Sequence, residues 1–360
     1  MKKSVKIIIM MLVVFSIIII GCSQKPVETE APASVDNDVK ATVIWRSFDD
    51  QYQSGFRIIM EKEVEKIGGI VLDMQDGEND VVKTTNKLES ALSKGTDSVA
   101  ICAPDRESTS SLMEKCKSDN VPVVFFNMEP YEETMNNYDK IWYVGAEAKE
   151  SGVMCAQALI DYWNANKEIA DKNGDGVLQL VILQGEIGHN DVILRTEAYE
   201  ETLKAQGIDY EIIAIDTANW DKGQALDKMN AWISAFGIDG IEGVLANNDG
   251  MAMGAVQAAL NNNYNTGDPE KFIPIVGIDA TVEALEAMKN GSLLGTVLND
   301  RQNQSIAVIN VLKAVTKGQK VTPEIVGVAS TVDGKYIWIP YVIVNQSNLD
   351  AILKLMVEVE

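Results

Sequence analysis

Short runs rich in valine and isoleucine alternate along most of the chain with amphipathic stretches of helical period. Such apolar runs are typical of strands buried in a parallel sheet, and the amphipathic stretches are typical of the helices that cover it. The pattern therefore predicts successive β-α-β units. The predicted strands of a first sheet are Ala41–Trp45, Ile70–Met74, Ser98–Cys102, Pro122–Phe126 and Trp142–Gly145.

The same alternation starts again in the second half of the chain and predicts a second sheet. Two α/β domains, each a doubly wound parallel sheet, are the expected architecture, with the chain crossing between them more than once. Near the C-terminus we expect a late strand at Tyr336–Val344 and a final helix at Asn348–Met356. The predicted strands of the second sheet are Leu178–Leu183, Tyr210–Ile215, Gly243–Leu245, Ile273–Ile278 and Leu293–Leu298.

The N-terminal residues have the pattern of an export signal. Three lysines in the first six residues precede an apolar run from Ile7 to Ile20. A spanning helix needs roughly 20 apolar residues, and a secretory signal needs about 7–15, so residues 1–21 are predicted to be a signal peptide. The run ends in Gly21-Cys22, which resembles a bacterial lipobox and implies lipid attachment at Cys22; an ordinary signal with a chance cysteine is the alternative.

Residues 22–40 contain few large apolar side chains, so we expect them to form a flexible tether between a membrane anchor and the folded part. The net charge of −22 becomes −25 without the lysines of the signal, which argues against nucleic acid as a partner. The remaining cysteines, Cys102, Cys116 and Cys155, lie within apolar or helical patterns. We expect three buried thiols, with one disulfide as the alternative.

Polar, planar side chains follow the predicted strands. In an open parallel sheet, ligands bind beyond the carboxyl ends of the strands, where such side chains would meet. A single Asp or Asn after a strand is more often a turn residue or a helix N-cap, but repetition in both halves of the chain indicates one binding cleft. The residues are Asp50, Asn127, Asn248, Asp279 and Asn299.

The segment between the two sets of strands adds further candidates. His189 is the only histidine, which excludes a multi-histidine zinc site, and no nucleophile elbow, Walker loop or dinucleotide glycine pattern is present. Asp191 and Arg195 are four residues apart, so they share a helix face, where both could reach a ligand; a surface ion pair is the alternative. Trp220 and Tyr52 are rings that suit the apolar face of a pyranose, unless both belong to the core.

A second motif has the oxygen-ligand spacing of a calcium-binding EF-hand loop. Gly176 occupies position 6, and position 12, where an EF-hand places a bidentate Glu, is Ile182. A further carboxylate must therefore come from elsewhere, and a polar turn is the alternative. The candidate ligands at positions 1, 3, 5, 7 and 9 are Asp171, Asn173, Asp175, the carbonyl of Val177, and Gln179.

Several segments resemble, in order, those of the bacterial galactose/glucose-binding proteins, which are periplasmic receptors with an EF-hand-like loop. The resemblance extends from Ala41 to the C-terminus and implies that Glu242 is the sixth ligand of a structural Ca²⁺. It also implies hydrogen bonds to a hexose from the polar residues above, with Tyr52 and Trp220 stacking on the ring. The matching segments are 121–127, 171–195, 216–221, 246–254 and 295–300.

The fold implied by the resemblance is that of a type I periplasmic binding protein with a three-segment hinge. Its lobes would comprise residues 41–146 with 300–336, and 147–299 with 337–360. The implied ligand is D-glucose or D-galactose, bound by a monomer that serves an ABC sugar permease, with a chemoreceptor as a further partner left open. The alternatives are a receptor for ribose or a quorum signal and a sugar-modifying enzyme using Asp191 and His189.

Overall fold

The structure is a computed structural model that describes residues 38–359; the predicted signal peptide, Cys22 and nearly all of the predicted tether lie outside these residues. A seven-stranded sheet has the order β11-β12-β5-β4-β3-β1-β2, and all its pairings are parallel except β11 with β12. Its strands are β1 (Val39–Trp45), β2 (Ile70–Asp76), β3 (Ser98–Ile101), β4 (Val123–Phe126), β5 (Ile141–Gly145), β11 (Thr331–Asp333) and β12 (Tyr336–Trp338).

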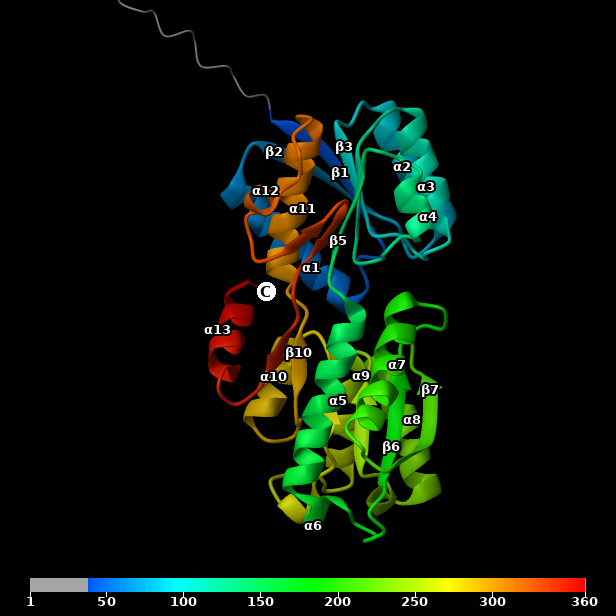
Figure 1. Ribbon diagram of the computed structural model, residues 1–360, viewed down its shortest axis with the longest axis vertical. Coiled ribbons are helices and arrows are strands. Elements are labelled where there is room, and N and C mark those ends of the chain that lie inside the picture. The colour runs from blue at the N-terminus through cyan, green and yellow to red at the C-terminus, as the bar shows by residue number, and fades with distance from the viewer. Residues whose placement is uncertain (1–37, 360) are drawn as a thin grey trace, which may run out of the picture. The chain divides into compact units, whose positions relative to one another are not determined.

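Alternate residues of these strands pack against helices on opposite faces of the sheet. Along β1, Val43 and Trp45 belong to one apolar cluster and Ile44 belongs to another. The first cluster lies under α1 and α11 and the second under α2 and α3 (Figure 1), so this sheet is doubly wound as predicted. The helices are α1 (Gln51–Ile67), α2 (Val81–Ser93), α3 (Ser108–Ser118), α4 (Glu132–Asn136), α11 (Arg301–Thr316) and α12 (Pro323–Val326). We call this part the first lobe.

The second lobe contains a parallel four-stranded sheet of order β7-β6-β8-β9 and a separate antiparallel pair, β10 with β13. The predicted run Leu293–Leu298 forms the short β10, and Gly295 just before β10 makes a parallel bridge to Val276, so the run continues the edge of the parallel sheet beside β9. The strands are β6 (Leu178–Gln184), β7 (Tyr210–Thr217), β8 (Gly243–Ala246), β9 (Ile275–Val276), β10 (Thr296–Leu298) and β13 (Val342–Val344); the helices are α5 (Ala148–Ala165), α6 (Lys167–Ala170), α7 (Asn190–Ala205), α8 (Lys222–Phe236), η1 (Ile238–Gly240), α9 (Asp249–Asn261), η2 (Pro269–Lys271), α10 (Val282–Lys289) and α13 (Leu349–Val359).

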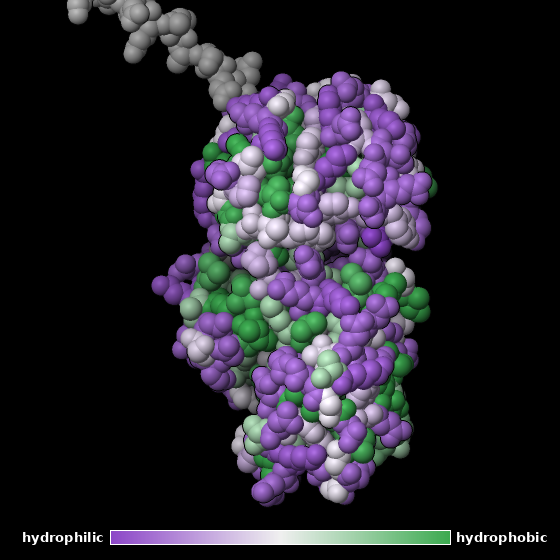
Figure 2. All heavy atoms as spheres, viewed as in Figure 1, coloured by the Kyte–Doolittle hydropathy of each residue, from purple (hydrophilic) through white to green (hydrophobic). Residues whose placement is uncertain are grey.

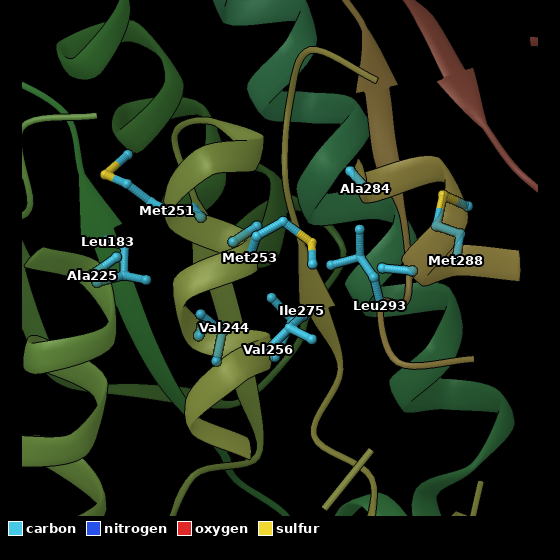
Figure 3. Packing of buried hydrophobic residues seen from close by; sticks show 14 of the residues in the cluster. Leu183, Ala225, Val244, Met251, Met253, Val256, Ile275, Ala284, Met288 and Leu293 are labelled. Atoms are coloured by element: carbon cyan, nitrogen blue, oxygen red, sulfur yellow. The ribbon is translucent and has the colours of Figure 1, made fainter. Parts of the chain in front are cut away.

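Methionine and aliphatic side chains fill the largest core of the second lobe. Figure 3 shows Met253 and Val256 of α9 lying beside Ile275 and Leu293. The opposite face of the sheet packs against α5 and α7 through a separate cluster that includes Leu159. Both sheets are thus covered on both faces, which leaves their carboxyl-end loops as the place for a ligand.

The chain passes between the lobes three times: after β5 into α5, after β10 into α11, and after β12 into β13 (Figure 1). The prediction of one late strand at Tyr336–Val344 is wrong. Tyr336–Trp338 pairs with β5 in the first lobe, whereas Val342–Val344 pairs with β10 in the second. The crossing lies at residues 339–341, so the first lobe extends two residues beyond the expected limit at residue 336.

Cys102, Cys116 and Cys155 are buried and free, as expected. Burial raises the pKa of Cys102 and Cys116 to about 12, so these two thiols are protonated and unreactive at neutral pH.

Hydrophilic side chains cover most of the face shown in Figure 2, and apolar ones gather over the part that carries α13. Across residues 38–359, no helix has the length and apolarity needed to cross a membrane.

Candidate functional site

The polar residues at the strand ends also shape the backbone around them. The Asp50 side chain accepts a hydrogen bond from Gln53 N (2.8 Å) at the start of α1, and Asn248 Oδ1 accepts one from Met251 N (2.9 Å) at the start of α9. Both residues are therefore helix N-caps, the ordinary role for such positions. Each cap uses one oxygen, so Asp50 retains a second carboxylate oxygen for a ligand.

All ten residues expected to contact a ligand lie in the wall of one cavity, which both lobes form. The empty space within this wall, counted together with the part open to solvent, is about 490 Å³. Two more residues that the sequence analysis did not single out, Arg46 and Gln53, belong to the same wall. The lining residues are Arg46, Asp50, Tyr52, Gln53, Asn127, His189, Asp191, Arg195, Trp220, Asn248, Asp279 and Asn299.

His189 is held as a neutral hydrogen-bond donor. Its Nδ1 accepts a hydrogen bond from Asp191 N (3.2 Å), which makes His189 the N-cap of α7. Burial lowers the pKa of His189 to about 4. The nearby guanidinium groups of Arg46 and Arg195 also lower this pKa, whereas the carboxylate of Asp191 raises it. With Nδ1 accepting, the single proton of the neutral ring lies on Nε2, which can donate to a ligand.

Arg195 connects the cavity with the elements around it. It is 3% exposed and donates hydrogen bonds to Asn247 O (2.7 Å), Tyr341 Oη (3.0 Å) and Ser151 Oγ (3.3 Å). Its Nη2 also lies 3.1 Å from Asp191 Oδ2, which confirms the predicted pairing on one helix face. Because Tyr341 lies in the crossing at residues 339–341, the guanidinium joins the cavity wall to the hinge.

The two predicted aromatic rings come from opposite lobes. Trp220 meets His189 edge-on, with ring centroids 5.2 Å apart, and the Arg195 guanidinium carbon lies 5.9 Å from the Trp220 ring centroid. The indole lies so close to Gly185 that a Cβ there would approach the ring to 2.3 Å, so any larger residue would displace it. Tyr52 belongs to α1 and has the Arg301 guanidinium carbon 5.4 Å from its ring centroid.

Carboxamide side chains in the wall are oriented by neighbouring groups. Asn127 Oδ1 accepts a hydrogen bond from Gln53 Nε2 (2.8 Å), so its NH₂ group is available to a ligand. Asn299 Oδ1 accepts one from Gln304 Nε2 (2.7 Å), and Asn299 Nδ2 lies 3.4 Å from Asp279 Oδ1. Such bonds hold polar groups in place before a ligand arrives, which lowers the cost of binding.

Asp279 is an unusual carboxyl group. It is 5% exposed and has a φ of 123°, a backbone conformation that residues other than glycine rarely adopt. Burial raises the pKa of Asp279 to about 8 despite the opposing effect of Arg195 and Arg301. A ligand hydroxyl that donates to this carboxylate would supply part of the solvation that burial has removed.

Arg46 could have been found by the rule that identified the other residues at strand ends, whereas Gln53 lies within α1. Arg46 directly follows β1 and lies at a strand end, but only acids and amides were sought there. Its Nε donates to Asn79 Oδ1 (2.8 Å), and its Nη2 forms an ion pair with Glu186 of the second lobe. Arg46 therefore links the two lobes at the edge of the cavity.

The loop predicted to bind calcium lies between α6 and β6. Asp171 Oδ1 and Oδ2 accept hydrogen bonds from Gly174 N and Gly176 N, both at 2.9 Å. These glycines have φ values of 74° and 82°, the left-handed conformation that a tight ligand loop requires. Asn173 Nδ2 and Gln179 Nε2 both lie near Asp175 Oδ2, at 3.0 and 3.1 Å, so the side chains at positions 3, 5 and 9 converge.

Glu242, in the residues before β8, joins this loop from the neighbouring chain segment. Its Oε1 accepts a hydrogen bond from Lys172 N (2.7 Å) and its Oε2 accepts one from Gln179 N (3.1 Å). The residue is 0% exposed, and burial raises the pKa of Glu242, as does the carboxylate of Asp171. A divalent cation would relieve this repulsion between the buried Glu242 and the half-buried Asp171, so the donor set fits Ca²⁺.

The acidic side chains would not suffice for such an ion. Within the part of the chain that the structure describes, no three His, Cys, Asp or Glu side chains gather closely enough to hold a metal. A bound ion would also need amide oxygens from Asn173 and Gln179 and the carbonyl oxygen of Val177. Rotating each carboxamide by half a turn would exchange its NH₂ for its oxygen, since the two are nearly equal in shape.

Known proteins are similar to this chain over most of its length. A model of the periplasmic binding protein domain matches residues 41–320. The chain belongs to the periplasmic binding protein family. It is 38% identical over 324 residues to the D-galactose/methyl-galactoside binding periplasmic protein MglB of Haemophilus influenzae, with 90% of this chain and 94% of the relative covered. The resemblance inferred from the sequence is thereby confirmed.

Other similar proteins are a xylitol-binding protein of Mycolicibacterium smegmatis, 31% identical over 81% of this chain and 77% of the relative, and two solved structures. A galactofuranose binding protein has a TM-score of 0.74 at 18% identity. An ABC transporter solute binding protein of Bacillus halodurans with bound myo-inositol has a TM-score of 0.73 at 23% identity. In both cases 89% of this chain and 99% of the other are covered. These likenesses establish the type I periplasmic binding protein fold.

Family membership decides between two of the interpretations left open by the sequence. The protein is an extracytoplasmic solute-binding protein and not an enzyme. His189 and Asp191 therefore do not act as a catalytic acid and base. The side chains of the cavity wall indicate which class of solute it binds.

Proposed function

We propose that the protein captures D-galactose or D-glucose in the cavity between its lobes and delivers the hexose to an ABC sugar importer. The observation that carries this proposal is the composition of one cavity wall. It combines two aromatic rings from opposite lobes with carboxylate, carboxamide, guanidinium and imidazole groups. A pyranose has an apolar face for a ring and hydroxyl groups around its edge, so it matches both kinds of wall.

The charged and neutral groups of the wall have complementary tasks. Carboxylates such as Asp191 accept hydrogen bonds from sugar hydroxyls, whereas Arg195 and His189 Nε2 donate to sugar oxygens. Each buried polar group that a ligand leaves without a partner costs about 1–3 kcal/mol. A ligand with a missing or misplaced hydroxyl should therefore bind much more weakly, which is how such a site would select one class of sugar.

Similarity to a galactose-binding relative supports a hexose, while similarity to a xylitol-binding relative supports an open-chain polyol as a second candidate. The two rings in the wall favour the hexose. An open-chain polyol exposes no flat apolar face, so Tyr52 and Trp220 would gain little from stacking on it. Direct comparison of the two ligands separates these candidates.

Capture would proceed in two steps. The sugar first contacts one lobe of an open cleft, and closure about the three crossing segments then brings the other lobe onto its remaining hydroxyls. The ion pair between Arg46 and Glu186 joins the lobes beside the cavity and would help to hold the closed form. An ABC sugar permease, and a chemoreceptor where a cell has one, would recognise that closed form.

Two accessory features complete the proposal. A Ca²⁺ ion would be held by Asp171, Asn173, Asp175, the Val177 carbonyl, Gln179 and Glu242, and it would stabilise the fold without contacting the sugar. A lipid on Cys22 would keep the protein at the outer face of the cell membrane after cleavage of residues 1–21. Metabolic labelling with a radioactive fatty acid, lost in Cys22→Ser, would test the anchor.

Calorimetric titration with D-galactose, D-glucose and xylitol tests the main proposal. We expect at least one hexose to bind and xylitol to bind much more weakly. Asp191→Ala should weaken hexose binding by at least about 100-fold, because hydrogen bonds to a charged group contribute about 1.5–3 kcal/mol each. Hexose binding by Asp191→Ala at the affinity of the unaltered protein would contradict the assignment of the site.

The control for Asp191→Ala makes the same change at an exposed place in the same lobe. Asp227 lies on the exposed surface of α8, so Asp227→Ala should bind like the unaltered protein. Circular dichroism must show that both variants are folded, since Asp191 also pairs with Arg195. Tight binding of xylitol with none of either hexose would replace the hexose proposal by the polyol.

A further inference from the structure

Beyond the cavity wall, one side chain of the second lobe forms hydrogen bonds with two oppositely charged residues of the first. Asn190 Oδ1 accepts a hydrogen bond from Arg106 Nη1 at 3.0 Å, and Asn190 Nδ2 donates one to Glu129 Oε2 at 3.2 Å. Asn190 lies at the first position of α7, whereas Arg106 and Glu129 follow β3 and β4. Both hydrogen bonds therefore cross from one lobe to the other.

The two partners are already placed by the first lobe. Arg106 Nη2 donates to Pro130 O at 3.3 Å, and its guanidinium carbon lies 4.3 Å from the centroid of the Tyr131 ring. Arg106 Nη2 also lies 3.8 Å from Glu129 Oε1. A cation and an anion thus stand side by side and face the second lobe. A carboxamide offers one acceptor and one donor, so Asn190 can satisfy both at once.

The position of Asn190 connects these bonds to the cavity. It lies between His189 and Asp191, which both belong to the cavity wall, but it is not part of that wall itself. Moving the second lobe away from the first would break both bonds without changing any bond within either lobe. They are therefore formed only when the lobes are together.

We infer that Asn190 is a positioning residue that holds the cleft closed through Arg106 and Glu129 and so sets how long the ligand is retained. The inference rests on the proposed function only in assuming that a ligand is enclosed by closure. An interaction present only in the closed form slows release and has little effect on the first encounter. Loss of the carboxamide should therefore raise the dissociation rate at least about 10-fold, as expected when a hydrogen bond to a charged group is lost.

Two variants remove the carboxamide without disturbing α7. Asn190→Pro is compatible with the first position of a helix, where the backbone N–H has no helical partner, and Asn190→Ala removes only the polar group. Stopped-flow fluorescence would follow D-galactose or D-glucose release, with Trp220 in the cavity wall as the reporter. Asn262→Ala is the control, because Asn262 Nδ2 bonds to Ala258 O within the second lobe; its release rate should be unchanged.

A double-mutant comparison distinguishes positioning from a general loss of stability. Glu129→Ala should raise the release rate, and combining it with Asn190→Ala should have little further effect, because both remove the same bond. The melting temperature without sugar should change little in Asn190→Pro. A release rate equal to that of the unaltered protein in Asn190→Pro, or fully additive effects in the double variant, would overturn the inference.

A measurement without any sugar keeps the inference separate from the choice of ligand. Ser93 and Gln206 are exposed residues of the two lobes, and the cysteines within residues 38–359 are all buried, so Ser93→Cys and Gln206→Cys can carry spin labels selectively. Asn190→Pro should lower the fraction of sugar-free molecules whose label-to-label distance is that of the closed form. An unchanged distance distribution would overturn the inference, whereas absence of hexose binding by the unaltered protein would overturn only the proposed function.

Discussion

The raised pKa of Asp279 predicts that sugar affinity depends on pH, and it fixes the direction of that dependence. Burial raises the pKa of the free carboxyl group to about 8. A sugar hydroxyl that donates to the carboxylate favours its ionised form, so the pKa falls when the sugar binds. The complex then holds fewer protons than the free protein, and affinity rises with pH up to about 8 and levels off above it.

The corresponding experiment is calorimetry of hexose binding at pH 7 in two buffers of different ionisation enthalpy. Binding should release a fraction of a proton, so the apparent enthalpy should differ between the buffers. Asp279→Asn should abolish that difference. His189 cannot supply it, because its pKa of about 4 keeps the ring neutral across this range. Identical enthalpies in both buffers would show that Asp279 does not change its protonation.

At this scale, sequence reasoning found residues whose position follows from chain direction. Asp50, Asn127 and Asn248 each follow a buried strand, and strands of a parallel sheet end at the same edge. Arg46 occupies an equivalent position but was missed because only acids and amides were considered. The contact between Asn190 and Glu129 could not be predicted, because it depends on how the two lobes come together.

The loop between α6 and β6 is the element for which metal dependence can be tested. Removal of Ca²⁺ with a chelator should lower the melting temperature by about 4 °C if the ion was present at about 100 times its dissociation constant. Glu242→Gln should be less stable and should respond little to the chelator. Glu211→Gln, an exposed change on β7, serves as the control. An unchanged melting temperature after chelation would contradict a structural ion.

Among the elements, strand positions were predictable where apolar runs were bounded by turns, as for β1, β4 and β6. The run Tyr336–Val344 failed for a physical reason. Ile339 and Tyr341 are as deeply buried in the crossing as residues of a strand, so burial alone does not distinguish the two. Pro340 marks the break, because proline removes a donor that a strand in the middle of a sheet would need.

At the scale of the whole molecule, both lobes contribute residues to the wall of one cavity. The cavity wall combines Asp50 and Tyr52 from the first lobe with Trp220 and Asp279 from the second, and three crossings tie the lobes together. A hexose at 100 times its dissociation constant stabilises the folded form by about 2.7 kcal/mol, which corresponds to a rise of about 4 °C in melting temperature.

Because the proposed ligand contacts both lobes, the rise in melting temperature should apply to unfolding of the first lobe as well as the second. Calorimetric scans with and without D-galactose or D-glucose, together with hydrogen exchange resolved by peptide, would measure it lobe by lobe. Xylose, which lacks the hydroxymethyl group of a hexose, is a suitable comparison and should stabilise less. Protection from hydrogen exchange confined to one lobe would mean that the sugar binds without closure. A ligand that contacts both lobes should slow hydrogen exchange in both.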